Sequence, residues 1–208
     1  FRPEPYEDRG KWYVGYGTTC NPADYPVPLT EEEADLLLRQ ALVSKEKVVN
    51  DLLRKYDISI TQYQFDALLS FTYTLGSQWI NPEYRLCSYL IRGIHHYDEV
   101  EVVNAIATWC HQGTTVLNHL ADRRLQEAYL FLYGQYDNNA ADMYTYIHFK
   151  PNGGEVENKT VFFPVGRAYG QLPVPELKGK IFAGWALADG TLLTGDEIAI
   201  SNLTVTAV

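Results

Sequence analysis

The chain has 208 residues, of which 46% are hydrophobic, so it can fold as one large domain or two small ones with a sizeable core. The 26 acidic residues outnumber the 17 lysines and arginines and give a formal net charge of −9. A field of that sign does not attract phosphate backbones, so nucleic acid is not expected as a partner. No apolar run approaches the roughly 18 residues that a membrane span needs.

The beginning of the chain predicts a short β-ribbon. Trp12–Thr19 combines aromatic and β-branched residues with two glycines, which permit tight turns. Asp8 stands just before this run. Taken alone, Asp8 is most simply a solvated loop carboxylate, and Tyr13 and Tyr16 are residues that pack within the strands.

A long amphipathic helix is predicted next. Thr30 can cap the free amides of its first turn while Glu33 reaches back to the cap, and acidic residues suit the positive end of the helix dipole. Apolar residues then recur at intervals of three and four from Ala34 to Leu53.

The following segments predict a buried helix and then shorter ones. Ser59–Phe71 is apolar nearly all round a helix, which indicates a central position, and Gly76 suits its end. Three further helical stretches are expected at Arg85–Arg92, Tyr97–Cys110 and Leu117–Tyr133.

The pattern changes after a polar, turn-prone segment at residues 135–139. Residues 144–150 and 203–208 alternate with period two, and residues 160–165 are β-branched and aromatic. We therefore expect an α+β protein with two domains. The first is a mainly helical domain with a small N-terminal β-ribbon at residues 1–138, and the second is a small β-rich domain at residues 143–208.

The ribbon and the helices carry a family resemblance. Tyr6-x-Asp8, Gly10 and then Gly15-Tyr16-Gly17 are similar to the opening of phage-type lysozymes, glycoside hydrolase family 24. The similarity continues through three segments that resemble the family's interdomain helix, buried helix and closing elements: Leu29–Leu38, Gln64–Gly76 and Trp109–Glu127.

The resemblance implies a muramidase that hydrolyses the β-1,4 bond between N-acetylmuramic acid and N-acetylglucosamine with inversion and without a cofactor. That reaction uses one carboxyl group to protonate the leaving glycosidic oxygen and another to activate water on the far face of the sugar. Asp8 matches the second group. The first is the Glu of the family's opening Glu-Gly pair, and it would fall two positions before Phe1.

The same resemblance assigns further site residues. Tyr13 stands where the family usually has a Thr that positions the water, and a Tyr hydroxyl also donates a hydrogen bond but fills more of the cleft. Arg123 matches a cation near the opening Glu. Equally, Arg123 and Arg124 can form a solvated helix face or weak surface ion pairs with Asp122 and Glu127. Besides Arg123, four residues are assigned to substrate binding: Tyr16, Thr18 (where the family commonly has His), Tyr73 and Ser88.

Three motifs follow one another in the β-rich part: Ile147-x-Phe149-x-Pro151-Asn152-Gly153-Gly154, Leu172-Pro173-x-Pro175 and Gly179-x-x-Phe182-Ala183-Gly184-Trp185. They are similar to the internalin B-repeat family, also called the Listeria–Bacteroides repeat. The resemblance implies a β-grasp-like module of an exported protein, with Phe182 and Trp185 in its core and no catalytic role.

The cysteines and histidines predict no metal site. Cys20, Cys87 and Cys110 are odd in number and lack paired ligand spacing, so we interpret them as free thiols. His95 and His96 would point about 100° apart on a helix, and no third ligand is spaced to join them.

The sequence therefore favours a monomeric peptidoglycan hydrolase, secreted or located at the bacterial cell surface, with a phage endolysin as one origin. The alternative is a catalytically degenerate lysozyme-like module that binds cell-wall glycan or a protein partner. Tyr13 and the position of the opening Glu outside the printed sequence favour that alternative.

Overall fold

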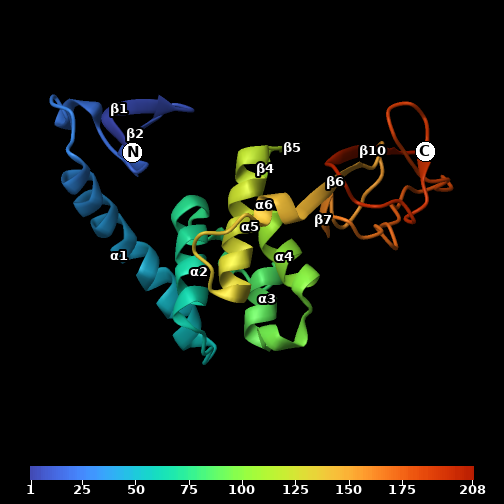
Figure 1. Ribbon diagram of the computed structural model, residues 1–208, viewed down its shortest axis with the longest axis horizontal. Helices are drawn as coiled ribbons and strands as arrows, with labels where there is room; N and C mark the ends of the chain where they lie inside the picture. The colour runs from blue at the N-terminus through green and yellow to red at the C-terminus, as the bar shows by residue number, and fades with distance from the viewer. The chain divides into compact units, whose positions relative to one another are not determined.

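The computed structural model covers residues 1–208 and shows an α+β protein, as predicted (Figure 1). Contacts within the chain divide it into two compact units, residues 1–59 with 68–79, and residues 60–67 with 80–208. The boundary falls inside the helix α2 (Gln62–Leu75). No helix combines the length and the apolar character that crossing a membrane requires.

The first unit opens with a three-stranded antiparallel sheet in the order β1-β2-β3. Its strands are β1 (Arg2–Asp8), β2 (Lys11–Gly15) and β3 (Thr18–Thr19), and a short 3-10 helix η1 (Pro22–Asp24) follows. Arg9 and Gly10 form the turn between β1 and β2 with φ angles of 53° and 77°. The ribbon is confirmed, and it starts earlier than Trp12 because β1 pairs along β2.

The helix α1 (Glu31–Lys55) begins at the predicted residue. The Thr30 hydroxyl accepts a hydrogen bond from the Glu33 amide at 3.2 Å, and the Glu33 carboxylate accepts one from the Thr30 amide at 2.8 Å. This capping box satisfies two amides that would otherwise lack helical partners. Arg54 and Lys55 lie in the last turn, where cations interact favourably with the helix dipole.

The ribbon lies directly against the first turn of α1. A Cβ atom added to Gly15 would lie 3.0 Å from the Cβ of Ala34, and Gly15 has a φ of 64°. Val14 and Ala34 are both fully buried. Glycine is required at position 15 because any side chain there would meet α1 and would also strain the backbone.

Trp79 anchors the end of α2 in the first unit. It is fully buried in the 3-10 helix η2 (Gln78–Ile80), and its indole nitrogen donates to the Thr72 hydroxyl at 3.1 Å. Its ring lies 5.9 Å from that of Phe71 in an edge-on arrangement. Gly76, with a φ of 73°, follows α2 as the sequence predicts.

The second unit combines helices with a five-stranded sheet. Its helices are α3 (Arg85–Arg92), η3 (Ile94–His96), α4 (Glu99–Ala107), α5 (Asn118–Tyr133) and α6 (Ala140–Met143). A small hairpin of β4 (His111–Gln112) and β5 (Thr115–Val116) joins α4 to α5. Asp98 and Glu101 form a second capping box at the start of α4.

The sheet has the strand order β7-β6-β10-β8-β9. Its strands are β6 (Tyr144–Lys150), β7 (Thr160–Pro164), β8 (Trp185–Ala186), β9 (Leu192–Leu193) and β10 (Leu203–Ala207). β10 runs parallel to β6, and the other neighbours are antiparallel. The three longer strands confirm the segments predicted from the period-two pattern.

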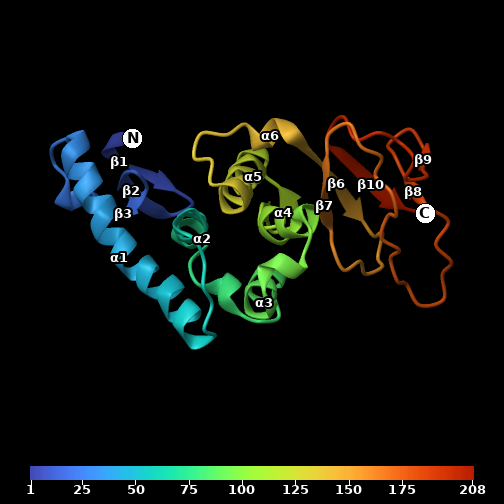
Figure 2. The same cartoon turned by 60° about the horizontal axis from the view of Figure 1, so that its bottom comes forward.

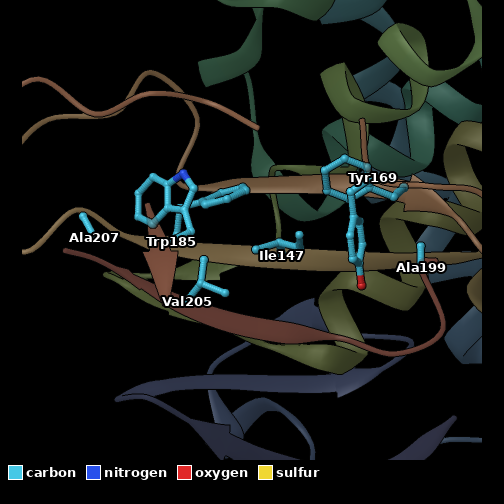
Figure 3. Close-up of a cluster of buried hydrophobic side chains, with 8 residues drawn as sticks. Ile147, Tyr169, Trp185, Ala199, Val205 and Ala207 are labelled. Carbon is cyan, nitrogen blue, oxygen red and sulfur yellow. The ribbon is translucent and has the colours of Figure 1, made fainter. Parts of the chain in front are cut away.

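One face of this sheet carries its own apolar core (Figure 3). Ile147 and Phe149 of β6 and Val205 of β10 are fully buried there, with Trp185 of β8. The Trp185 indole donates to the Pro173 carbonyl at 2.6 Å, and the Phe182 ring lies 5.3 Å from it. The expectation that both belong to the core is confirmed for Trp185, and Phe182 is partly buried and packs against this core.

The opposite face packs against the helices of the same unit, and Figure 2 shows β7 beside α4. The Asn104 side chain of α4 accepts a hydrogen bond from the Phe162 amide at 2.8 Å and donates to the Phe162 carbonyl at 2.9 Å. Tyr144 of β6 donates to the Glu99 carboxylate at 2.6 Å. Sheet and helices therefore share a continuous buried layer.

We expect Asn104→Ala to lower the free energy of unfolding by about 2–3 kcal/mol, because it leaves two buried backbone groups of Phe162 without partners. Urea denaturation followed by circular dichroism measures the change. Asn50→Ala, at an exposed position of α1, is the control and should have little effect. Equal stability of the two variants would contradict the role of this contact.

Candidate active site

Asp8 lies at the end of β1, where the chain turns into β2. Lys11 is directly opposite it, and the Arg9 Nε atom lies 3.7 Å from the Asp8 Oδ1 atom. The Asp8 side chain is 61% exposed, so this ion pair is a weak surface contact. The carboxylate is open to water.

Tyr13 lies on the same face of the ribbon as Asp8. The register pairs Tyr6 with Tyr13 and Asp8 with Lys11, and residues two apart on a strand share a face. The Tyr6 and Tyr13 rings lie 5.8 Å apart between centroids. Tyr13 therefore brings a hydroxyl to the face that carries Asp8, and its ring also packs within the sheet.

Thr18 lies on the other face. It pairs with Val14 in the register, whereas its neighbour Thr19 pairs with Tyr13. The Thr18 hydroxyl is buried. The structure therefore does not bring Thr18 to the face of Asp8.

Tyr16 and Tyr73 are joined to each other within the first unit. The Tyr73 hydroxyl of α2 donates to the Tyr16 carbonyl at 3.3 Å. The Tyr16 hydroxyl donates to the Glu31 carboxylate at 2.9 Å, and this hydrogen bond raises the pKa of Tyr16. These contacts hold the turn between β2 and β3 against α1 and α2.

Ser88 and Arg123 belong to the second unit. Ser88 lies half-buried in α3, and Arg123 lies in α5 with its side chain 43% exposed. The Arg123 Nε atom lies 3.1 Å from the Glu127 Oε1 atom, which confirms the pairing considered from the sequence. Glu127 is buried, however, so only the Arg123 side chain of this pair is exposed to solvent.

Arg124 is a buried cation, so the solvated face or surface ion pair considered for it from the sequence is wrong. Its side chain is 1% exposed, and its Nη2 atom lies 2.9 Å from the Glu127 Oε1 atom. Burial lowers the pKa of Arg124 to about 10. The Arg-Arg-x-x-Glu spacing indicates the pair, because residues three and four apart lie on one side of a helix, but it does not show that the pair is buried.

Residues 1–127 match the model of the phage lysozyme family. The chain belongs to the phage lysozyme family. The matched segment holds the ribbon, the helices α1 to α4 and most of α5, so every predicted site residue of this phage lysozyme lies within it. The sheet from β6 to β10 follows the matched segment.

Two curated relatives are similar over the same part of the chain. The endolysin of Bacillus phage B103 is 34% identical over 126 residues, which are 61% of this chain and 44% of that endolysin. The endolysin of Bacillus phage PZA is 32% identical over 119 residues, which are 57% of this chain and 42% of that endolysin. The phage lysozyme chain thus spans less than half the length of these relatives.

Solved structures share the fold of the matched part. The muramidase domain of SpmX from Asticaccaulis excentricus is 29% identical, with a TM-score of 0.51, and the match covers 64% of this chain and 87% of that domain. The endolysin from Escherichia coli O157:H7 phage FAHEc1 is 26% identical, with a TM-score of 0.56, and the match covers 66% of this chain and 87% of that endolysin.

We expect Glu127→Gln to destabilise the phage lysozyme by about 3 kcal/mol, because Arg124 would keep a buried charge without its carboxylate. Thermal unfolding measures the loss. Asp51→Asn is the matched control, since Asp51 also contacts two cations of its own helix but is 47% exposed. A loss no greater than that of the control would show that the buried pair contributes little.

Proposed function

We propose that the chain is a peptidoglycan hydrolase, an endo-acting muramidase of glycoside hydrolase family 24 that cleaves the β-1,4 bond between N-acetylmuramic acid and N-acetylglucosamine. Membership of the phage lysozyme family supports this function, as do relatives named endolysin and muramidase domain. The observation that carries the proposal is the exposed Asp8 carboxylate at the end of β1, with Tyr13 on the same face of the ribbon.

The proposed reaction is an inverting hydrolysis. A glutamic acid of the opening Glu-Gly pair, which the resemblance places two positions before Phe1, gives its proton to the glycosidic oxygen as the bond to the muramic acid C1 breaks. A water molecule attacks that carbon from the opposite face and transfers a proton to the Asp8 carboxylate. The Tyr13 hydroxyl donates a hydrogen bond that orients the water. No cofactor takes part.

The resemblance supplies the proposed glycan-binding residues. Tyr16 and Tyr73 offer aromatic faces on which sugar rings stack. The Tyr73 hydroxyl is held by the Tyr16 carbonyl, and the Tyr16 hydroxyl is held by Glu31. Ser88, which is half-buried, offers a hydroxyl. The resemblance assigns Arg123 as a cation that tunes the protonation of the catalytic acid.

We further propose that two parts of the chain have separate roles. Residues 1–138 form the hydrolase domain, and residues 143–208 form a β-grasp-like module of the internalin B-repeat type. The turn at Asn152-Gly153, with φ angles of 51° and 90°, is consistent with the Asn-Gly-Gly motif of that family. The module would serve wall attachment or spacing in a monomeric protein that is secreted or located at the cell surface.

A second candidate function is glycan binding without cleavage. The observation in its favour is the packing of Tyr13 against Tyr6, because a tyrosine fixed beside Asp8 takes up space that the attacking water needs. In that case the chain would sediment with peptidoglycan and release no fragments.

We expect Asp8→Asn to lower the rate of peptidoglycan digestion by at least about 100-fold, because the amide cannot take a proton from water. Release of soluble muropeptides from purified peptidoglycan measures the rate, and the protein carries any residues encoded before Phe1. Glu7→Gln is the control, since Glu7 is exposed and lies on the other face of β1.

The outcomes separate the two functions. Digestion by the unsubstituted protein and by Glu7→Gln, with loss in Asp8→Asn, supports the hydrolase. Digestion that survives in Asp8→Asn removes Asp8 from the reaction. Sedimentation with peptidoglycan but no digestion by any of the three proteins supports the binding module.

A further inference from the structure

A cavity of about 520 Å³ lies between the β4–β5 hairpin and the sheet of the second unit. We call it the hairpin groove. Thr115 and Val116 line it from the hairpin. Lys150, Lys159 and Thr204 line it from the sheet and from the residue before β7. Tyr146 and His148 also line it.

The register of the sheet builds one side of this groove. Tyr146, His148 and Lys150 alternate along β6 and so project from the same face. Thr204 of β10 is the direct neighbour of His148. The Phe149 amide donates to the Lys159 carbonyl at 2.8 Å, which holds Lys159 beside β6. Two lysines, a histidine and a threonine therefore line the groove from three adjacent chain segments.

Fixed hydrogen bonds hold the rings of the groove in place. The Tyr146 hydroxyl donates to the Asn118 side chain at 2.8 Å, and the Tyr146 ring lies 5.6 Å from that of Phe162. The His148 Nδ1 atom lies 2.9 Å from the hydroxyl of the buried Thr160, which also lies 2.8 Å from a ring nitrogen of His111. A site whose rings are already ordered loses little conformational entropy when a ligand binds.

The charge in the groove opposes that of the whole chain. The chain carries a formal net charge of −9, yet no carboxylate lines this cavity and both of its lysines are exposed. These lysines also act on His148 in the groove. Burial is the largest cause that lowers the pKa of His148, and the nearby His111 and the two lysines lower it further. The groove is therefore a locally cationic site on an acidic protein.

We propose that the hairpin groove binds an oxyanion, a carboxylate or a phosphate, carried by a cell-wall polymer. Lysine ammonium groups act as point charges for such ligands, and the hydroxyls of Thr115 and Thr204 add neutral donors. Only the source of the oxyanion rests on the proposed function: it is a free carboxylate of a peptidoglycan peptide stem or a phosphodiester of an anionic wall polymer. The groove is formed by the hairpin before α5 and by the sheet. It would bind the polymer through its charge, and this binding would be separate from cleavage of the sugar bond.

Isothermal titration calorimetry with the full chain tests the proposal. The probes are a disaccharide tetrapeptide with free carboxylates, the same compound with amidated carboxylates, and a glycerol phosphate trimer. The test variant is K150Q/K159Q, which removes both charges and keeps polar side chains of similar length. The control is K178Q/K180Q, which removes two exposed charges elsewhere after β7. Circular dichroism checks that each variant is folded.

We expect K150Q/K159Q to weaken binding of an anionic probe by about tenfold or more, and K178Q/K180Q to bind like the unsubstituted chain. A preference for the carboxylate compound over its amidated form identifies the peptide stem, and a preference for the glycerol phosphate trimer identifies the phosphate polymer. The proposal is overturned if neither anionic probe binds to the unsubstituted chain. It is also overturned if K150Q/K159Q binds the anionic probe as tightly as K178Q/K180Q does. Because binding is measured without cleavage, failure of the groove and failure of the hydrolase are separate results.

Discussion

The close approach of the ribbon to α1 is the constraint on which the proposed chemistry depends. Gly15 allows the backbone of β2 to meet Ala34, and the Tyr73 hydrogen bond holds the next turn. With β2 fixed in this way, pairing with β1 determines that Asp8 stands at the exposed end of the ribbon. A side chain at position 15 would therefore move the Asp8 carboxylate, the proposed base, without touching it.

The sheet of the second unit is stabilised in a different way, because side chains pack against both of its faces. Ile147 and Phe149 face its own core, whereas Tyr144 and Tyr146 face the helices. The edge strand β7 is protected by Asn104, whose amide pairs with the Phe162 backbone as a neighbouring strand would. The hairpin groove lies beside this layer, because residues of the hairpin and of β6 line the same cavity.

Local patterns predicted much of this fold from the sequence, because capping and periodicity act within a few residues. The Thr30–Glu33 box and the strands from Tyr144 and Leu203 are examples. The Asn104–Phe162 contact could not be predicted, since it joins residues 58 positions apart. In the site, the face of Thr18 depends on the length of the turn after Gly15, because a shift of one residue reverses every side chain of a strand. Arg124 is buried and Arg123 is not, because adjacent helical positions differ by about 100°.

The identity of the new reducing ends formed during peptidoglycan digestion tests the central claim most directly. The digest is reduced with borohydride and analysed by mass spectrometry. A hydrolase that uses Asp8 to activate water predicts N-acetylmuraminitol ends with one added water for each bond broken. N-acetylglucosaminitol ends would place the cut at the other glycosidic bond, and 1,6-anhydromuramic ends would show that water is not the attacking group. Either result would contradict the account.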